Sequence, residues 1–229
     1  MSISKSDKLL LIKNFLKNNP SLKKFTYHNI FYSKYSALLK HHCEENIVSV
    51  INNDNDQQLF RYTFPINKQL IDLTIYVEYI RELFLFTKKS ENIFPKVELK
   101  YINDTLYLDK FICEFTYYSE EDCHKTYENN DEVFVIPFPN IPLKYVIADG
   151  NHRISKQINS GIESFSARFV NCDICIKSMR NSFDAAIFMV LFDCALIEYN
   201  LGKVPDSQIK EKLFLFRNDL NDLLSHKRL

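Results

Sequence analysis

Apolar side chains recur at helical spacing near the start of the chain. Between residues 5 and 18 they fall on one side and lysines on the other, which predicts an amphipathic helix that Pro20 ends. A second helix is expected from Tyr27 to about Glu44. Two β-rich stretches, 46–52 and 58–64, flank a polar turn and predict a hairpin, and residues 67–88 predict a further helix.

The pattern changes in the middle of the chain. Four stretches rich in β-branched and aromatic residues predict the strands of a small sheet: 96–102, 105–117, 132–138 and 145–148. Residues 114–132 hold seven acids against one lysine, which indicates a solvated loop. A short helix at 152–160, a strand at 164–170, a long apolar helix at 174–200 and an amphipathic helix at 206–225 are expected to follow. The predicted class is α+β, with helices flanking a mixed sheet.

Composition supports a folded protein. The 229 residues are 46% hydrophobic and 25% charged, enough for a sizeable core, which excludes collagen-like and disordered chains. The net charge is zero, yet residues 1–40 carry eight lysines and one acid, a local excess of seven positive charges. This segment is the candidate contact for nucleic acid, and a solvated helix face explains the same lysines.

Six scattered cysteines and the short N-terminal apolar run predict reduced thiols in a cytoplasmic protein without a membrane segment. Cys172 and Cys175 form a lone C-x-x-C that could bind zinc with Cys123 and His124. Two neighbouring ligands at fixed spacing are a weak signal, so we interpret these residues as buried thiols.

The segment from Tyr145 to Val170 carries the most informative motif. An apolar strand turns through Asp149 and Gly150 directly into a helix. The unpaired N–H groups at a helix start form an anion site, which the helix dipole strengthens. His152 and Arg153 would be disfavoured in that first turn unless an anion lies between them and the amides. The pattern therefore predicts a phosphate site, and a purely structural turn capped by Asp149 is the alternative.

The run Val146-Ile-Ala-Asp-Gly-Asn-His-Arg is similar to the Asp-Gly-x-His-Arg signature of the ParB/sulfiredoxin-like superfamily. The resemblance covers about residues 95–170. Sulfiredoxin has Cys where this chain has Asn151, and partition proteins have Glu-Arg-Arg. The serine-kinase-type pattern, Asp-Gly-His-His-Arg, is the nearest one.

The resemblance implies roles for particular residues. Nucleotide phosphates would be held by the helix start and its side chains, at Gly150, Asn151, His152 and Arg153. Apart from the resemblance, Arg168 on the strand after Gly161 is a secondary candidate for the same phosphate, with a solvated strand residue as the alternative. Asp149 would be catalytic and would bind Mg²⁺, and His152 would act at the same centre. Glu114, which ends a predicted strand, is the candidate second carboxylate; a solvated loop charge is the alternative for it.

The leading hypothesis is a nucleotide-binding protein that holds ATP, ADP or CTP with Mg²⁺, with phosphotransferase or nucleotide hydrolase activity as the chemistry that the resemblance suggests. Three regions are expected: helices with a hairpin over 1–92, a ParB/sulfiredoxin-like core over 93–172, and C-terminal helices over 173–229 packed on the core or on the N-terminal helices. The alternative is a DNA-associated regulator or defence-related protein, including a nuclease. Its predicted phosphate contacts are Lys5, Lys8, Lys13, Lys17, Lys23 and Lys24.

Overall fold

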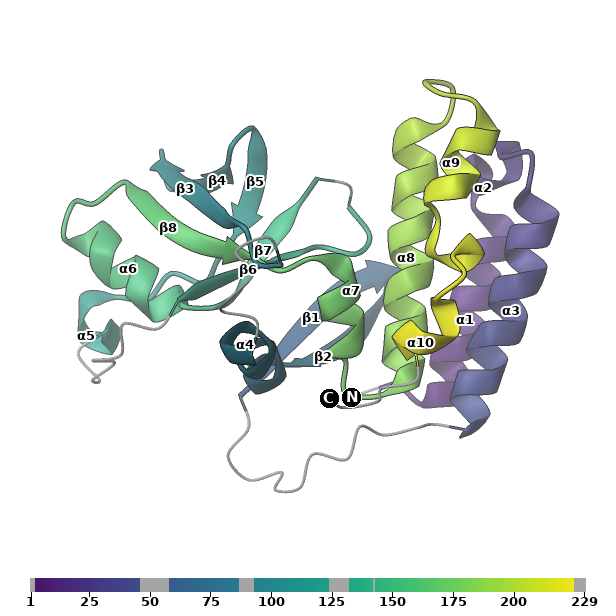
Figure 1. Ribbon diagram of the computed structural model, residues 1–229, viewed down its shortest axis with the longest axis horizontal. Coiled ribbons are helices and arrows are strands. Elements are labelled where there is room, and N and C mark those ends of the chain that lie inside the picture. Colours follow the sequence, from purple (N-terminus) through teal and green to yellow (C-terminus); the bar gives the residue numbers. More distant parts are fainter. Residues whose placement is uncertain (1–2, 46–57, 87–92, 124–131, 142, 225–229) are drawn as a thin grey trace. The chain divides into compact units, whose positions relative to one another are not determined.

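The computed structural model describes residues 3–45, 58–86, 93–123, 132–141 and 143–224 (Figure 1). The chain divides into two compact units, each built from separate stretches of sequence. The first comprises residues 1–76, 139–142 and 176–229, and the second comprises residues 77–138 and 143–175. The N-terminal and C-terminal helices therefore share one unit, and the predicted core shares the other with the helix that precedes it.

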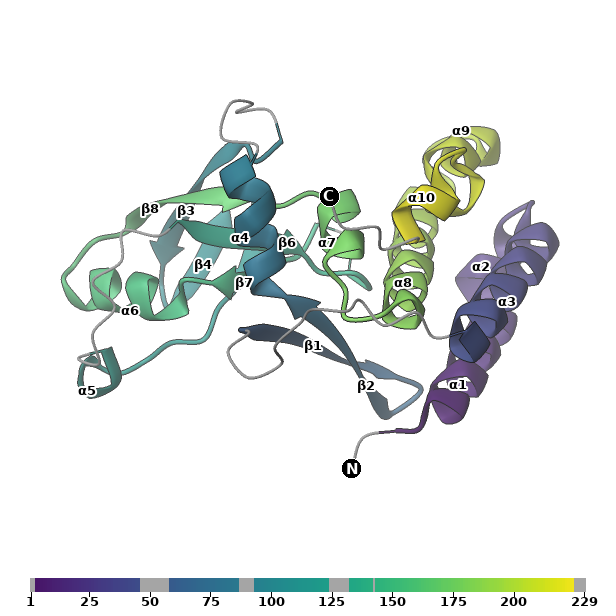
Figure 2. The same ribbon diagram turned by 60° about the horizontal axis from the view of Figure 1, so that its bottom comes forward.

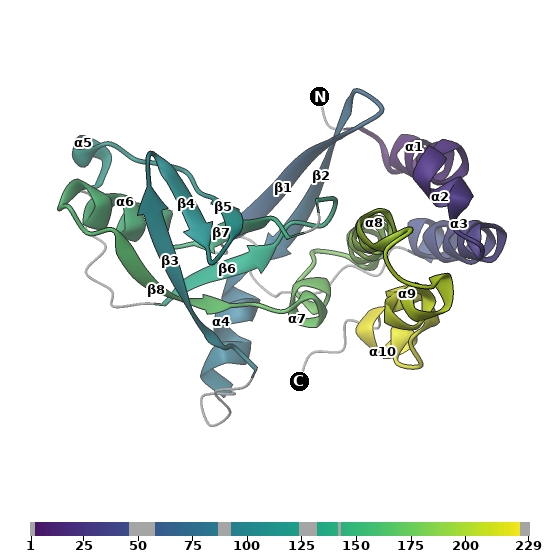
Figure 3. The same cartoon turned by 90° about the horizontal axis from the view of Figure 1, so that it is seen from above.

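The first unit is a helix bundle built around α8 (Ser182–Asn200). This helix is apolar all round and buried along most of its length, as expected for a central helix. Figure 3 shows α8, α1 and α3 nearly end-on. The other helices of the bundle are α1 (Lys5–Asn18), α2 (Pro20–Lys24), α3 (His28–Glu45), α9 (Asp206–Lys212), the 3₁₀ turn η1 (Phe214–Phe216) and α10 (Leu220–Leu224).

A buried carboxylate ties the bundle together. Asp193 of α8 is fully buried; it accepts hydrogen bonds from the Tyr35 hydroxyl at 2.6 Å and from the backbone N–H groups of Phe214 at 2.9 Å and Leu215 at 3.1 Å. One carboxylate thus connects α3, α8 and η1, and burial raises its pKa to about 7.

A two-stranded hairpin completes the first unit, with its tip beside the start of α1 in Figure 2. Strand β1 (Leu59–Ile66) pairs antiparallel with β2 (Gln69–Tyr76). The predicted helix over 67–88 is wrong over β2 and right over α4 (Val77–Phe86). Asn67 and Lys68 have positive φ angles, 48° and 68°, and form the two-residue turn that starts β2. The stretch 46–52, predicted to pair with 58–64, lies outside the described residues.

The second unit is a six-stranded closed barrel in the order β3-β4-β5-β7-β6-β8. Its sheet is mixed, because β5 runs parallel to β7 and β6 parallel to β8. Nine buried residues from the strands and α6, among them Leu99, Val135 and Ile147, fill the core. The strands are β3 (Lys96–Ile102), β4 (Thr105–Leu108), β5 (Phe111–Glu114), β6 (Val133–Pro137), β7 (Tyr145–Asp149) and β8 (Ser164–Phe169).

The predicted α+β class is confirmed by the helices and the two sheets of the described residues. Two predicted elements are broken by turns. The strand expected over 105–117 divides into β4 and β5 at Asp109, whose φ is 53°. The helix expected over 174–200 divides into α7 (Cys172–Lys177) and α8. The remaining helices of the second unit are α5 (Glu120–Cys123) and α6 (Asn151–Asn159).

Candidate functional site

The candidate site lies in the second unit, where β7 passes into α6. Asp149 ends the strand, and Gly150 makes the turn with a φ of +99°. A Cβ atom at Gly150 would lie 2.7 Å from the Val133 side chain and 3.0 Å from the Arg153 guanidinium. Glycine is therefore required here both for backbone conformation and for space. Gly150 is the N-cap residue of α6 and has no side chain with which to cap the first turn.

Two arginines from different helices converge on the carboxylate of Asp149. Nη2 of Arg81, on α4, lies 2.5 Å from Oδ2 of Asp149, and Nη2 of Arg153, on α6, lies 3.5 Å from the same oxygen. The Asp149 side chain is 9% exposed, and those of Arg81 and Arg153 are 30% and 17% exposed. Arg81 also pairs with Glu78 at 3.0 Å. The turn thus holds guanidinium groups in a largely dry setting, where charge-assisted contacts are strong.

A third guanidinium, that of Arg168 on β8, is linked to the same turn through Glu132. The Glu132 carboxylate pairs with Nε of Arg168 at 3.3 Å, and its backbone carbonyl accepts a hydrogen bond from Arg153 at 3.0 Å. The Arg168 guanidinium also lies 5.4 Å from the ring centroid of Phe84, on α4. We name Arg81, Arg153 and Arg168 the arginine cluster. Its carboxylate partners are Glu78, Asp149 and Glu132.

The sequence motif did not reveal Arg81, which lies 68 residues before Asp149. The amino-acid composition contains a signal that could have pointed to Arg81, namely the scarcity of arginine. The chain has seven arginines against 22 lysines, and three of those arginines meet in this cluster. Arginine in a lysine-rich chain indicates a position where planar, bidentate contacts matter.

The structure gives the predicted phosphate ligands Asn151 and His152 partners within the protein. Asn151 Nδ2 donates to the Ile147 carbonyl at 3.2 Å, and the imidazole of His152 stacks on the Tyr118 ring. Polar groups on α6 also hold the chain at 116–118. These hydrogen bonds join the Thr116 N–H to Asn151 Oδ1 at 2.8 Å, the Tyr118 N–H to Ser155 Oγ at 3.0 Å, and the Tyr117 hydroxyl to Asn159 Oδ1 at 2.5 Å. The first part of the expected acidic loop is therefore fixed to α6.

Glu114, the predicted second carboxylate, ends β5 beside Val146 of β7. Its side chain is half-exposed and forms an ion pair with Lys144, which precedes β7, whereas Asp149 ends that strand. Glu114 therefore contacts the start of β7, whereas the turn follows the end of that strand.

The predicted nucleic-acid lysines of the first unit differ in their surroundings. Lys8 is largely buried: Nζ donates to the Asp72 carbonyl at 2.7 Å and lies 3.7 Å from the Asp184 carboxylate. A residue engaged in this way is a poor phosphate contact. Lys5, Lys17, Lys23 and Lys24 are exposed, and Lys13 is partly exposed.

The cysteines form no disulfide bond among the described residues. Burial raises the pKa of the Cys113 thiol to about 12, which keeps it protonated and unreactive. No group of three or more metal-ligating side chains occurs in the described parts of the chain, and His124 lies outside them. Cys172 is partly buried and Cys175 is buried.

Comparisons with known proteins gave no match: no family model, no curated protein and no solved structure is similar to this chain. Among the helices of the described segments, none combines the length and the apolar character needed to cross a membrane.

Proposed function

We propose that the protein binds the phosphate groups of a nucleotide at the Asp149–Arg153 turn, with Arg81 and Arg153 as the principal ligands. The observation that carries the proposal is the convergence of these two guanidinium groups on one carboxylate oxygen at the start of α6. Both groups have fixed partners that orient them: Glu78 pairs with Arg81, and the Glu132 carbonyl accepts from Arg153. A planar guanidinium can donate two parallel hydrogen bonds to two oxygens of a phosphate.

The surroundings of the turn support an anionic ligand. The N-cap residue of α6 is Gly150, which has no side chain to cap the first N–H groups of the helix. The start of a helix favours negative charge. In the free protein the three guanidinium groups of the cluster face three carboxylates, so an incoming phosphate would replace Asp149 as the partner of Arg81 and Arg153.

A magnesium ion could bind at the turn together with the phosphate that replaces Asp149 as the partner of Arg81 and Arg153. Mg²⁺ in nucleotide sites is usually held by one or two carboxylates together with the phosphates. Asp149 is the carboxylate at the turn, and losing its guanidinium partners to the phosphates would free its oxygens for the ion. The supported role is binding, since the second predicted carboxylate, Glu114, pairs with Lys144.

We further propose that the barrel belongs to the ParB/sulfiredoxin-like class. The support is the Asp-Gly-x-His-Arg run in its strand-turn-helix setting and the mixed sheet around it. The side chains of Asn151 and His152, to which the resemblance gives phosphate contacts, also contact the 116–118 segment.

A thermal-shift panel tests the proposal. ATP, ADP and CTP, each with and without Mg²⁺, should raise the melting temperature in proportion to binding. A ligand at 100 times its dissociation constant adds about 2.7 kcal/mol to the free energy of unfolding. A panel without any shift, repeated by calorimetry at high ligand concentration, would contradict the proposal.

A further inference from the structure

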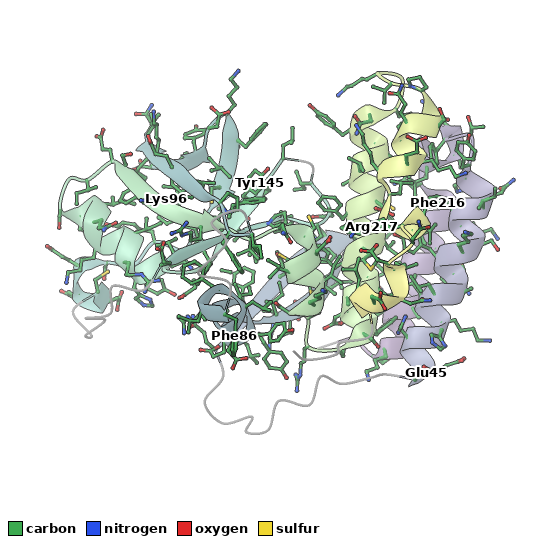
Figure 4. The ribbon with its side chains drawn as sticks, viewed as in Figure 1. Glu45, Phe86, Lys96, Tyr145, Phe216 and Arg217 are labelled. Atoms are coloured by element: carbon green, nitrogen blue, oxygen red, sulfur yellow. The ribbon has the colours of Figure 1, made fainter. Side chains whose placement is uncertain are left out.

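Two lysines of the first unit share one aromatic ring. The Nζ atoms of Lys34, on α3, and Lys210, on α9, each lie 5.1 Å from the ring centroid of Phe216, on η1. Lys210 also lies 4.8 Å from the centroid of Tyr27. Figure 4 labels Phe216 beside the helices that carry these lysines. The two ammonium groups are therefore within about 10 Å of each other, about one screening length at 0.1 M salt, so their electrostatic potentials overlap.

No carboxylate within the described residues forms an ion pair with either ammonium group, although carboxylates lie nearby. Asp206, one turn before Lys210, accepts hydrogen bonds from the Thr26 N–H at 2.7 Å and from the Thr26 hydroxyl at 2.6 Å, which lower its pKa. Asp219 pairs with Arg217 at 2.6 Å. Neither acid pairs with Lys34 or Lys210, so no ion pair within the described residues has to break before an anion contacts the ammonium groups of the patch formed by Tyr27, Lys34, Lys210 and Phe216.

We propose that this basic-aromatic patch binds the sugar-phosphate backbone of a nucleic acid. Lysine is a compact charge on a flexible stem, which suits phosphates that need no fixed orientation. Aromatic rings beside a basic track are typical of surfaces that hold single strands without sequence preference. The four residues come from two stretches far apart in the sequence, 27–34 and 210–216, so the patch exists only in the folded unit. Its residues belong to the first unit, whereas those of the nucleotide site belong to the second.

The test is fluorescence anisotropy with a labelled oligothymidine of about 15 nucleotides and a duplex of the same length, at about 50 mM salt. The variant is Lys34→Gln with Lys210→Gln. The matched control is Lys100→Gln, an exposed lysine of the second unit paired with Glu98 at 3.4 Å. A double Lys→Arg variant keeps both charges and reports on folding.

The Gln double variant should bind the single strand at least tenfold more weakly than the wild type. The slope of log affinity against log salt should become shallower by about 0.7 for each lysine removed. Lys100→Gln and the Arg variant should bind like the wild type, and ADP affinity should not change. Equal binding by the Gln variant and the wild type would overturn the proposal. So would binding of phosphatidylserine vesicles without binding of either oligonucleotide.

Discussion

The ring of Tyr118 stacks on the imidazole of His152, with centroids 3.7 Å apart and planes inclined by 19°. The first turn of α6 therefore makes two sets of contacts: Arg153 belongs to the arginine cluster, and His152 packs on Tyr118. His152 fixes the chain that leaves β5, together with the hydrogen bond between the Thr116 N–H and Asn151. The imidazole of His152 thus contacts the 116–118 segment in the structure, and a phosphate contact at the same residue stays a prediction.

Replacing either member of this pair should loosen the segment. Tyr118→Leu and His152→Ala should both increase amide hydrogen exchange at residues 116–118, because each removes the stacked contact. Nucleotide affinity distinguishes a His152 that only holds the 116–118 segment from a His152 that also contacts phosphate. Equal, small losses in both variants indicate positioning, whereas a large loss in His152→Ala alone would show that the imidazole contacts phosphate.

Gly150→Ala should destabilise the second unit. The added Cβ would meet Val133 at 2.7 Å, and the φ of +99° is strained for any other residue. We expect a loss of about 2–4 kcal/mol in urea unfolding, because strain and overpacking add. Gly161→Ala is the control: its φ is +80° and nothing lies within 4 Å, so strain alone should cost about 1–2 kcal/mol. If the two variants lost similar amounts of unfolding free energy, the close packing of Val133 against Gly150 would be contradicted.

Asp193 should make stability depend on pH. Burial raises its pKa from 3.8 to about 7, so between these values the folded state holds a proton that the unfolded state has lost. The free energy of unfolding should therefore fall as pH rises through this window, by up to about 1.4 kcal/mol per pH unit.

Asp193→Asn supplies the comparison for this pH effect. The amide keeps an acceptor for Tyr35 and carries no proton to lose, so its unfolding free energy should change less between those pH values. Parallel pH profiles for the wild type and the variant would show that Asp193 does not carry the effect.

Local signals in the sequence were sufficient for several elements. The strand-turn-helix at 145–160 was predicted because its apolar strand, its glycine and its helical spacing all lie within a few residues. The hairpin strand β2 was misread as helix because its residues also fit a helical spacing. The turn at Asn67 and Lys68, which makes this segment the second strand of a hairpin, contains neither glycine nor proline to mark it in the sequence.

The site itself depends on contacts between distant residues. Arg81 reaches Asp149 across 68 residues, and only the packing of α4 in the second unit brings it there. The same applies to Glu132, whose carbonyl orients Arg153 while its carboxylate pairs with Arg168. Motif spacing describes neighbours in the chain, so it indicated Arg153 and missed Arg81.

The most direct test of the phosphate site is calorimetric titration of ADP and ATP, with Mg²⁺, into the wild type, Arg81→Lys and Arg153→Lys. Arg61→Lys, an exposed arginine of the hairpin, is the matched control. Each cluster variant keeps its charge and loses the bidentate guanidinium, so affinity should fall about tenfold or more while the control binds like the wild type. Unchanged affinity in both Arg81→Lys and Arg153→Lys would contradict the account, and so would a wild type that binds neither nucleotide.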